Sequence, residues 1–286
     1  MVDTTDLFCV EEFGNDNYRE SGGSRDKHWK SLMNEGHTVL SQLACVATVA
    51  GFNLVGSGNV ARFDETSPPE YSLSGAATLS DARTMVVIGS GGREFWRTFT
   101  ETPTTADPDE LRRAGGSIDA YSKIVLTRMA KIVESEGARC EILYPFGKPT
   151  RPVSFRRLAE HCGLGVADTV LGVVIHPQFG PWVSLRGTLV TDLELPETQR
   201  LDEFKPCNDC AQPCKEVCPI GTYDSETWDF ASCVRYRLFR DGCPTGCGSR
   251  IACVIGRDER YSREEYQYRH EFTDAAKESL SRRYNQ

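Results

Sequence analysis

The chain reads Cys207-Asn208-Asp209-Cys210-Ala211-Gln212-Pro213-Cys214-Lys215-Glu216-Val217-Cys218-Pro219 in its C-terminal third, and this stretch decides how that region folds. Two, three and three residues separate its four cysteines, and a proline follows the last one. Thiolates at this density suit an iron–sulfur cluster, because each [4Fe–4S] cluster needs four of them. A second group of four cysteines follows: Cys233, Cys243, Cys247 and Cys253. The eight thiolates together predict two [4Fe–4S] clusters and a protein that transfers electrons.

These cysteines could also serve zinc binding, disulfide formation or a single cluster. Structural zinc takes four thiolates too, but its ligands usually come as two C-x2-C pairs that lie well apart in the sequence. Disulfide bonds are expected in exported proteins, whereas the first residues here are acidic and lack the apolar core of a signal peptide. One cluster would leave four of the cysteines spare. We interpret the pattern as two clusters, and we expect a location in the reducing cytoplasm.

The cysteine spacing resembles that of bacterial two-cluster ferredoxins, in which the fourth cysteine of a run ligates the other cluster. The first set would then consist of Cys207, Cys210, Cys214 and Cys253. The second set would consist of Cys218, Cys233, Cys243 and Cys247. Two features depart from the ferredoxin pattern: the last spacing, from Cys247 to Cys253, is longer, and Val254 replaces the second proline. The pattern therefore predicts eight ligands and leaves open which cysteine serves which cluster.

Composition limits the remaining possibilities. With 286 residues, 39% of them hydrophobic, the chain can bury one sizeable core and carry a small extra module. Its longest apolar stretch, around Leu43 to Leu54, is interrupted by polar residues and does not predict a membrane span. A net charge of −8 argues against a nucleic-acid surface. The expected partners are an electron donor or acceptor protein and a small-molecule substrate.

The pattern of apolar residues divides the chain into four segments. We expect a flexible arm over residues 1–28, a layered domain over 29–203, a cysteine module over 204–260 and a helical tail over 261–286. The predicted helices of the layered domain cover Trp29–Gly51, Ser117–Glu136 and Val153–Cys162. Its predicted strands cover Thr84–Ile88, Cys140–Leu143, Leu171–Ile175 and Trp182–Leu195. This alternation indicates a layered fold, which we assign to the α+β class. Cys45 and Cys162 fall on apolar helical faces and are expected in its core.

Three loops of the layered domain could bind a ligand. Gly89 to Arg93 could present amide groups to a phosphate, although a purely structural turn is the favoured interpretation. After Leu143, Tyr144 and Phe146 could flank a flat ring while Arg151 binds an anion. A proline-stiffened connection accounts for that loop equally well. His176 could donate a proton or act as an axial ligand, but a lone histidine in a turn is more often structural.

Several short motifs in a fixed order resemble the epoxyqueuosine reductases. They are Gly163-Leu164-Gly165, His176-Pro177-x-Phe179-Gly180-x-Trp182, Thr191-Asp192-Leu193 and then the cysteine run. The resemblance implies a nitroreductase-like domain fused to a two-cluster ferredoxin module, with cobalamin held between them; reductive dehalogenases share this layout. The chain also resembles proteins known only as bacterial ferredoxins, through Pro145-Phe146-Gly147, Arg186-Gly187 and the segment from Gly246 to Asp258.

The chain departs from the reductase pattern at two places. The aspartate proposed as proton donor in the reductases falls at or near Pro149 here, and Val166-Ala167-Asp168 replaces their Gly-Lys-Asn turn. Because of these departures and the net charge of −8, we do not expect the chain to act on tRNA.

Two functional hypotheses follow. In the first, an oxidoreductase passes electrons from two clusters to a corrinoid, or less favourably a flavin, in the crevice between the modules. The residues expected to bind that cofactor are Tyr144, Phe146, Arg151, His176, Trp182 and Arg186. In the second, the crevice is empty and the protein is an electron carrier that docks on a partner enzyme. A pocket of small-molecule size beside a cluster would favour the first hypothesis.

Overall fold

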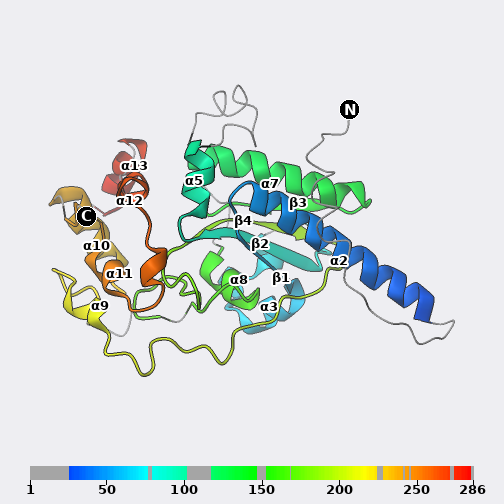
Figure 1. Cartoon of the computed structure of the whole chain (residues 1–286), viewed down its shortest axis with the longest axis horizontal. Coiled ribbons are helices and arrows are strands. Elements are labelled where there is room, and N and C mark those ends of the chain that lie inside the picture. The colour runs from blue at the N-terminus through cyan, green and yellow to red at the C-terminus, as the bar shows by residue number, and fades with distance from the viewer. Residues whose placement is uncertain are drawn as a thin grey trace.

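A four-stranded antiparallel sheet organises the larger part of the molecule (Figure 1). The computed structural model describes residues 26–76, 79–101, 117–146, 153–167, 169–223, 228–240, 242–244, 246–270 and 274–284. The strands are β1 (Leu54–Asn59), β2 (Thr84–Gly91), β3 (Cys140–Leu143) and β4 (Val183–Thr191). They lie in the order β1-β2-β4-β3, and every neighbouring pair is antiparallel. The fold is therefore mixed α and β with a small antiparallel sheet, in agreement with the α+β prediction.

Helices cover both faces of this sheet, and the central strand β2 is buried along its whole length. Side chains alternate along a strand, so Val86 and Ile88 pack against one helical layer while Met85 and Val87 pack against the other. The first layer contains α2 (Asp26–Val49), α5 (Glu94–Glu101) and α7 (Ile118–Ser135). The second contains α3 (Val60–Thr66) and α8 (Phe155–His161), with the short η1 (Pro69–Tyr71) and α4 (Leu73–Ala76) following α3 in the chain.

The ends of the two long helices follow from local chemistry. The Ser117 hydroxyl accepts a hydrogen bond from the amide of Ala120 at 3.2 Å and caps the start of α7. Gly137 follows the end of α7 with a φ of +77°, and Gly51 follows α2 with a φ of +80°. Both helices were predicted with nearly these bounds. The start of α2 at Asp26 means that residues 26–28 of the predicted arm are helical, and residues 1–25 lie outside the described part.

The structure adds one strand that was not predicted and corrects two strands that were. Strand β1 was not predicted, because its sequence LVGSGN is poor in strand-forming residues. Strand β2 does not end near Ile88 but continues to Gly91 through a bulge between Ile88 and Gly89. Residues Leu171–Ile175 are not a strand: Gly172 adopts a φ of +64°, and only an isolated bridge joins Val166 to Ile175.

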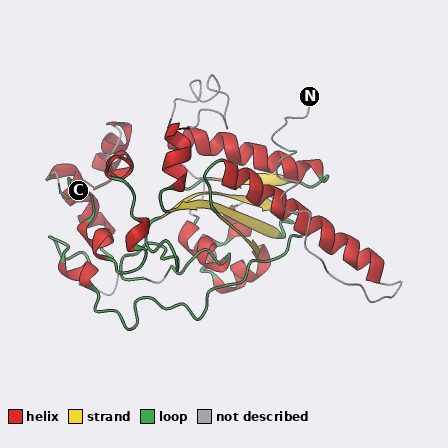
Figure 2. Ribbon diagram, viewed as in Figure 1, coloured by secondary structure: helices red, strands yellow, loops and turns green. Residues whose placement is uncertain are grey.

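The C-terminal part consists of short helices and loops and lies beside one end of the sheet (Figure 2). Its helices are α9 (Pro213–Glu216), α10 (Phe230–Phe239), α11 (Gly248–Ala252), η2 (Arg257–Glu259), α12 (Arg263–His270) and α13 (Asp274–Tyr284). Helix α9 packs against α11, and α10 packs against α13. None of the helices in the described ranges is long and apolar enough to cross a membrane.

The loop from His176 to Trp182 joins the two parts. A Cβ on Gly91 would lie 2.1 Å from the Phe179 ring, so this ring packs directly on the end of β2. The same loop also contacts the cysteine module, since a Cβ on Gly180 would lie 2.1 Å from the carbonyl oxygen of Ile255. Such close approach requires glycine at both positions. The joint is therefore tightly packed and fixes the cysteine module against the sheet.

Candidate metal centre

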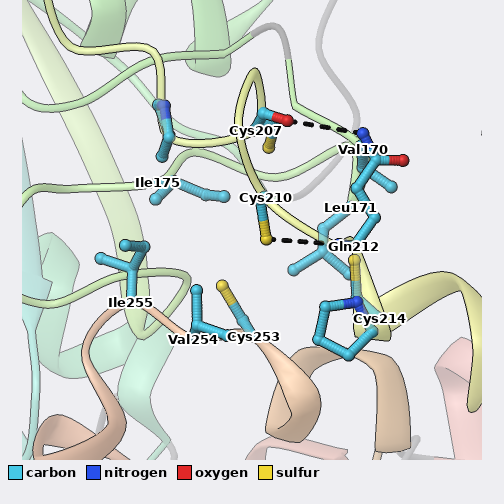
Figure 3. A pocket seen from close by; sticks show the side chains of 12 residues that line it. Val170, Leu171, Ile175, Cys207, Cys210, Gln212, Cys214, Cys253, Val254 and Ile255 are labelled. Atoms are coloured by element: carbon cyan, nitrogen blue, oxygen red, sulfur yellow. Dashed lines mark hydrogen bonds between the residues drawn. The ribbon is translucent and has the colours of Figure 1, made fainter.

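The four cysteines of the first set surround one cavity (Figure 3). Cys207, Cys210 and Cys214 come from the cysteine run and Cys253 from the end of α11, and Leu171 and Ile175 of the layered domain close the cavity. The amide of Gln212 donates to the sulfur of Cys210 at 3.4 Å, and the Gln212 side chain donates to the Cys207 carbonyl at 3.4 Å. Gln212 achieves this with a left-handed backbone, at a φ of 54°.

The second set gathers around α10. Cys233 lies on that helix, and burial together with the nearby charges of Cys247, Cys243 and Cys218 raises the pKa of its thiol to about 11. Burial, followed by the charges of Cys247 and Cys218, also raises the pKa of the Cys243 thiol. The structure thus brings together two groups of four cysteines, and each group includes one cysteine from the other segment of the chain. The assignment of each group to one cluster stays a prediction.

Whether the eight thiols are free bears on the disulfide alternative, and how closely they converge bears on metal binding. None of the eight cysteines forms a disulfide bond. Within the described ranges, no three His, Cys, Asp or Glu side chains converge closely enough to hold a single metal ion. A four-iron cube is wider than one ion, so its thiolates stand further apart than the ligands of zinc, and the finding does not bear on a cluster.

A pocket of about 230 Å³ borders the first set. Glu160, Gly165 and Val166 line it from the layered domain, and Lys205, Cys207 and Asn208 line it from the cysteine module. Glu160 is held in place because its carboxylate accepts a hydrogen bond from the amide of Ala167 at 3.0 Å. The pocket therefore offers both a carboxylate and an ammonium group next to a cysteine of the first set. Apart from Cys207, these residues were not predicted as site residues, although Gly165 belongs to the Gly163-Leu164-Gly165 motif and Val166 follows it.

Three of the six predicted cofactor-binding residues lie together beside α7. The rings of Tyr144 and Phe146 are 5.1 Å apart, and the Arg186 guanidinium lies 5.2 Å from the Phe146 ring centre. Arg186 is itself buried, pairs with Asp119 at 2.5 Å and donates to the Ser122 hydroxyl at 3.0 Å. Arg151 lies outside the described residues. The expectation that this loop marks a ligand site rested on the rule for open parallel sheets, which does not apply to an antiparallel sheet.

His176 and Trp182 lie elsewhere, in the joint between the two parts. The Nδ1 atom of His176 accepts hydrogen bonds from the amides of Gln178 and Phe179 at 3.1 and 3.2 Å. Trp182 is only 1% exposed, and the Arg250 guanidinium lies 5.0 Å from its ring centre. Both residues therefore contribute to the packing of the joint, and their role in cofactor binding stays a prediction.

Two further predictions have structural outcomes. The segment from Gly89 to Arg93 serves as a strand end, where the Gly91 amide donates to the Asn53 side chain at 2.7 Å. This agrees with the favoured structural interpretation. Cys162 is fully buried in the core, as predicted, whereas Cys45 is half-buried.

No protein-family model matches the chain. No curated protein matches it in sequence. Solved structures do resemble it, among them the epoxyqueuosine reductase of Streptococcus thermophilus, at 16% identity and a TM-score of 0.52. That alignment covers 76% of this chain but only 65% of the reductase.

Two weaker similarities concern other proteins. One is a B12-trafficking protein of C. elegans named CblC, with 16% identity, a TM-score of 0.49, and coverage of 88% of this chain and 96% of that one. The other is a reductive dehalogenase reported for B12-dependent dehalogenation, with 14% identity, a TM-score of 0.36, and coverage of 74% and 29%. The reductase comparison identifies the class of fold, and no particular family membership follows.

Proposed function

We propose that this chain is an iron–sulfur redox protein whose two [4Fe–4S] clusters pass electrons to a small molecule bound beside Cys207. The observation that carries the proposal is the 230 Å³ pocket that borders the first set of cysteines at the junction of the two parts. A redox enzyme needs its electron source next to its substrate, and a simple carrier needs no such pocket.

The donor atoms fit the proposed clusters. Eight free thiols, in two groups of four, match the ligand demand of two [4Fe–4S] clusters. The first set would hold its cluster against Leu171 and Ile175 of the layered domain, and the second set would hold its cluster around α10. The clusters would supply one-electron transfer, while Glu160, Lys205 and Asn208 would bind and orient the polar groups of the substrate.

A corrinoid fits the described residues less well. Pockets for drug-sized ligands measure about 300–1,000 Å³, and a corrinoid is larger than such a ligand. The pocket beside Cys207 is smaller than this range, and His176 and Trp182 are engaged in packing. We therefore assign the pocket to the substrate, and corrinoid binding is an outcome of the experiment below.

An electron carrier is the second candidate, and one observation favours it. Exposed apolar side chains gather in the cysteine module: Val217 and Ile220 beside Cys218, Val254 beside Cys253, and Phe230 and Phe239 on α10. Exposed apolar residues next to a redox centre suit the docking of a protein partner. This surface also serves a reductase, which must receive its electrons from a donor protein.

The experiment is an anaerobic titration of the reconstituted protein with cobalamin and with flavins, followed by visible and EPR spectra. If the protein is a reductase that uses a corrinoid, a cob(II)alamin signal with an altered axial ligand will appear. If it reduces its substrate directly from the clusters, neither cofactor will bind. In that case Lys205→Ala will weaken binding of small polar oxidants, whereas Lys131→Ala, on the exposed face of α7, will not. The carrier hypothesis predicts that no small oxidant binds and that both variants reduce a partner protein like the wild type.

A further inference from the structure

The hydroxyl groups of Thr222 and Tyr266 contact cysteines of the second set. The Thr222 hydroxyl oxygen lies 3.3 Å from the sulfur of Cys218. The Tyr266 hydroxyl accepts a hydrogen bond from the amide of Cys247 at 2.7 Å and donates to the carbonyl of the same residue at 3.2 Å. Both side chains are buried, at 4% and 8% exposure. The sulfur of Cys210 in the first set receives its described hydrogen bond from a backbone amide, that of Gln212.

Thr222 is also tied to a further cysteine of the second set. Its carbonyl accepts a hydrogen bond from the amide of Asp229 at 3.0 Å, and Asp229 caps the start of α10. Cys233 lies in the first turns of that helix. Thr222 therefore connects the sulfur of Cys218 with the helix that carries Cys233.

Tyr266 holds its cysteine in a different way. Its ring packs against Gly246, where a Cβ would lie 2.2 Å from the ring, and its hydroxyl reaches the backbone of the next residue, Cys247. Helix α12 carries Tyr266, so this contact anchors a cysteine of the second set to the C-terminal helices.

We propose that Thr222 and Tyr266 are positioning residues of the second cluster, and that the Thr222 hydroxyl raises the reduction potential of this cluster. The inference rests on the proposed function, because it requires a cluster on the second set. A thiolate bound to iron carries no proton, so the hydroxyl of Thr222 must donate. Reduction adds one electron and hence negative charge to the cluster and its sulfurs. A donor to sulfur therefore stabilises the reduced state more than the oxidised state and raises the potential.

The test is a redox titration of the anaerobically reconstituted protein, monitored by EPR, with the wild type, Thr222→Val and Thr222→Ser. Valine keeps the shape and removes the hydroxyl, and serine keeps the hydroxyl. We expect Thr222→Val to lower the potential of one cluster and leave the other unchanged, and Thr222→Ser to keep both potentials at their wild-type values. Unchanged potentials in Thr222→Val, or an equal shift in both variants, would overturn the assignment to the hydroxyl. A wild type without an iron–sulfur spectrum would instead refute the proposed function.

A second pair of variants covers the case in which Thr222→Val assembles one cluster only. Tyr261 packs in the same aromatic group as Tyr266, but its hydroxyl makes no hydrogen bond among the described residues. A chelator should remove iron from Tyr266→Phe in two phases. About half of the iron should leave faster than in the wild type, and the other half at the wild-type rate. Tyr261→Phe should behave like the wild type. Equal rates of iron loss in the two variants would contradict a positioning role for Tyr266.

Discussion

Two residues with a side chain, Gln212 and Cys243, adopt a left-handed backbone, at φ values of 54° and 57°. Among the described residues these are the only non-glycine positions with positive φ, and both lie in the cysteine segments. Such a conformation costs on the order of 1 kcal/mol and persists where the surroundings impose it. In Gln212 it directs the amide to the sulfur of Cys210, so the strain has a visible use at the candidate metal centre.

His161 provides a prediction about pH. Burial, followed by the positive charge of Arg200, lowers the pKa of this histidine below its usual 6.5. Its Nδ1 lies 3.2 Å from the Arg200 guanidinium, and its ring packs edge-on against Phe63. In the unfolded chain the residue binds a proton at higher pH than in the folded protein, so stability falls as the pH decreases below about 6.5.

The measurement is the melting temperature of the wild type and His161→Gln between pH 7.5 and 5. The wild type should lose more stability over this range than the variant does. Some pH dependence should remain in the variant, because burial also lowers the pKa of His176 and, with opposite effect on stability, raises the pKa of Glu265 to about 7. Parallel curves for the two proteins would contradict the assignment to His161.

At the scale of elements, helices α2, α7 and α8 and strand β3 followed from the sequence, whereas helices α3 and α10 and the glycine-rich strand β1 did not. Helix α7 and strand β3 were predicted within one residue, because a capping serine and a short apolar run mark them. Strand β1 contains Gly56, where a Cβ would lie 2.2 Å from the carbonyl of Cys162 in the adjacent helical layer. Here close packing selects glycine against strand propensity, and no local pattern reveals that contact.

The same reasoning accounts for the limits at the candidate site. The cysteine run could be recognised, because its spacing is local in sequence, and the number of ligands stays a prediction. The pocket beside Cys207 joins Glu160 with Lys205 and Asn208, and the hydroxyl of Tyr266 reaches Cys247 from another helix. These are long-range contacts, so a single sequence does not show them. The strand predicted at Leu171–Ile175 was wrong for a related reason. Its apolar residues Leu171 and Ile175 line the cavity of the first set and do not belong to a sheet.

Helix α12 is expected to depend on a buried ion pair. Arg269 lies 2.8 Å from Glu265, and their side chains are only 12% and 0% exposed. Arg269 also donates to the Ser184 hydroxyl of β4 at 3.1 Å, so the pair ties α12 to the sheet. Removing one partner leaves the other charge buried, which costs about 3–5 kcal/mol, whereas replacing both by apolar side chains is often nearly neutral.

We therefore expect Arg269→Met to lower the melting temperature by on the order of 10 °C. The double variant Glu265→Met/Arg269→Met should recover most of this loss. The matched control is Arg282→Met, because its ion pair with Glu278 on α13 is exposed on both sides and should contribute little. A double variant that is less stable than Arg269→Met would contradict this account of α12.

At the scale of the whole molecule, the predicted crossing of the two sets would tie the two cysteine segments together. Cys253, the last cysteine, joins the first set, and Cys218 of the first run lies with the second. A paired substitution tests this crossing directly. Cys214→Ser/Cys253→Ser removes two ligands of one set if the sets cross, and one ligand of each set if they do not.

We expect Cys214→Ser/Cys253→Ser to keep about half of the wild-type iron and the EPR signal of one cluster. By contrast, Cys214→Ser/Cys218→Ser should disturb both clusters. Cys140→Ser serves as the control, since Cys140 belongs to β3 and to neither set. The reverse order, with Cys214→Ser/Cys253→Ser losing both clusters and Cys214→Ser/Cys218→Ser keeping one, would show that the sets do not cross.

The most direct test of the central claim is the content of iron and acid-labile sulfide in the anaerobically purified wild-type protein. Two [4Fe–4S] clusters on the eight cysteines predict about eight iron and eight sulfide ions per chain, with EPR signals from two reduced clusters. A protein that contains zinc without sulfide, or that contains neither iron nor sulfide after reconstitution, would contradict the account.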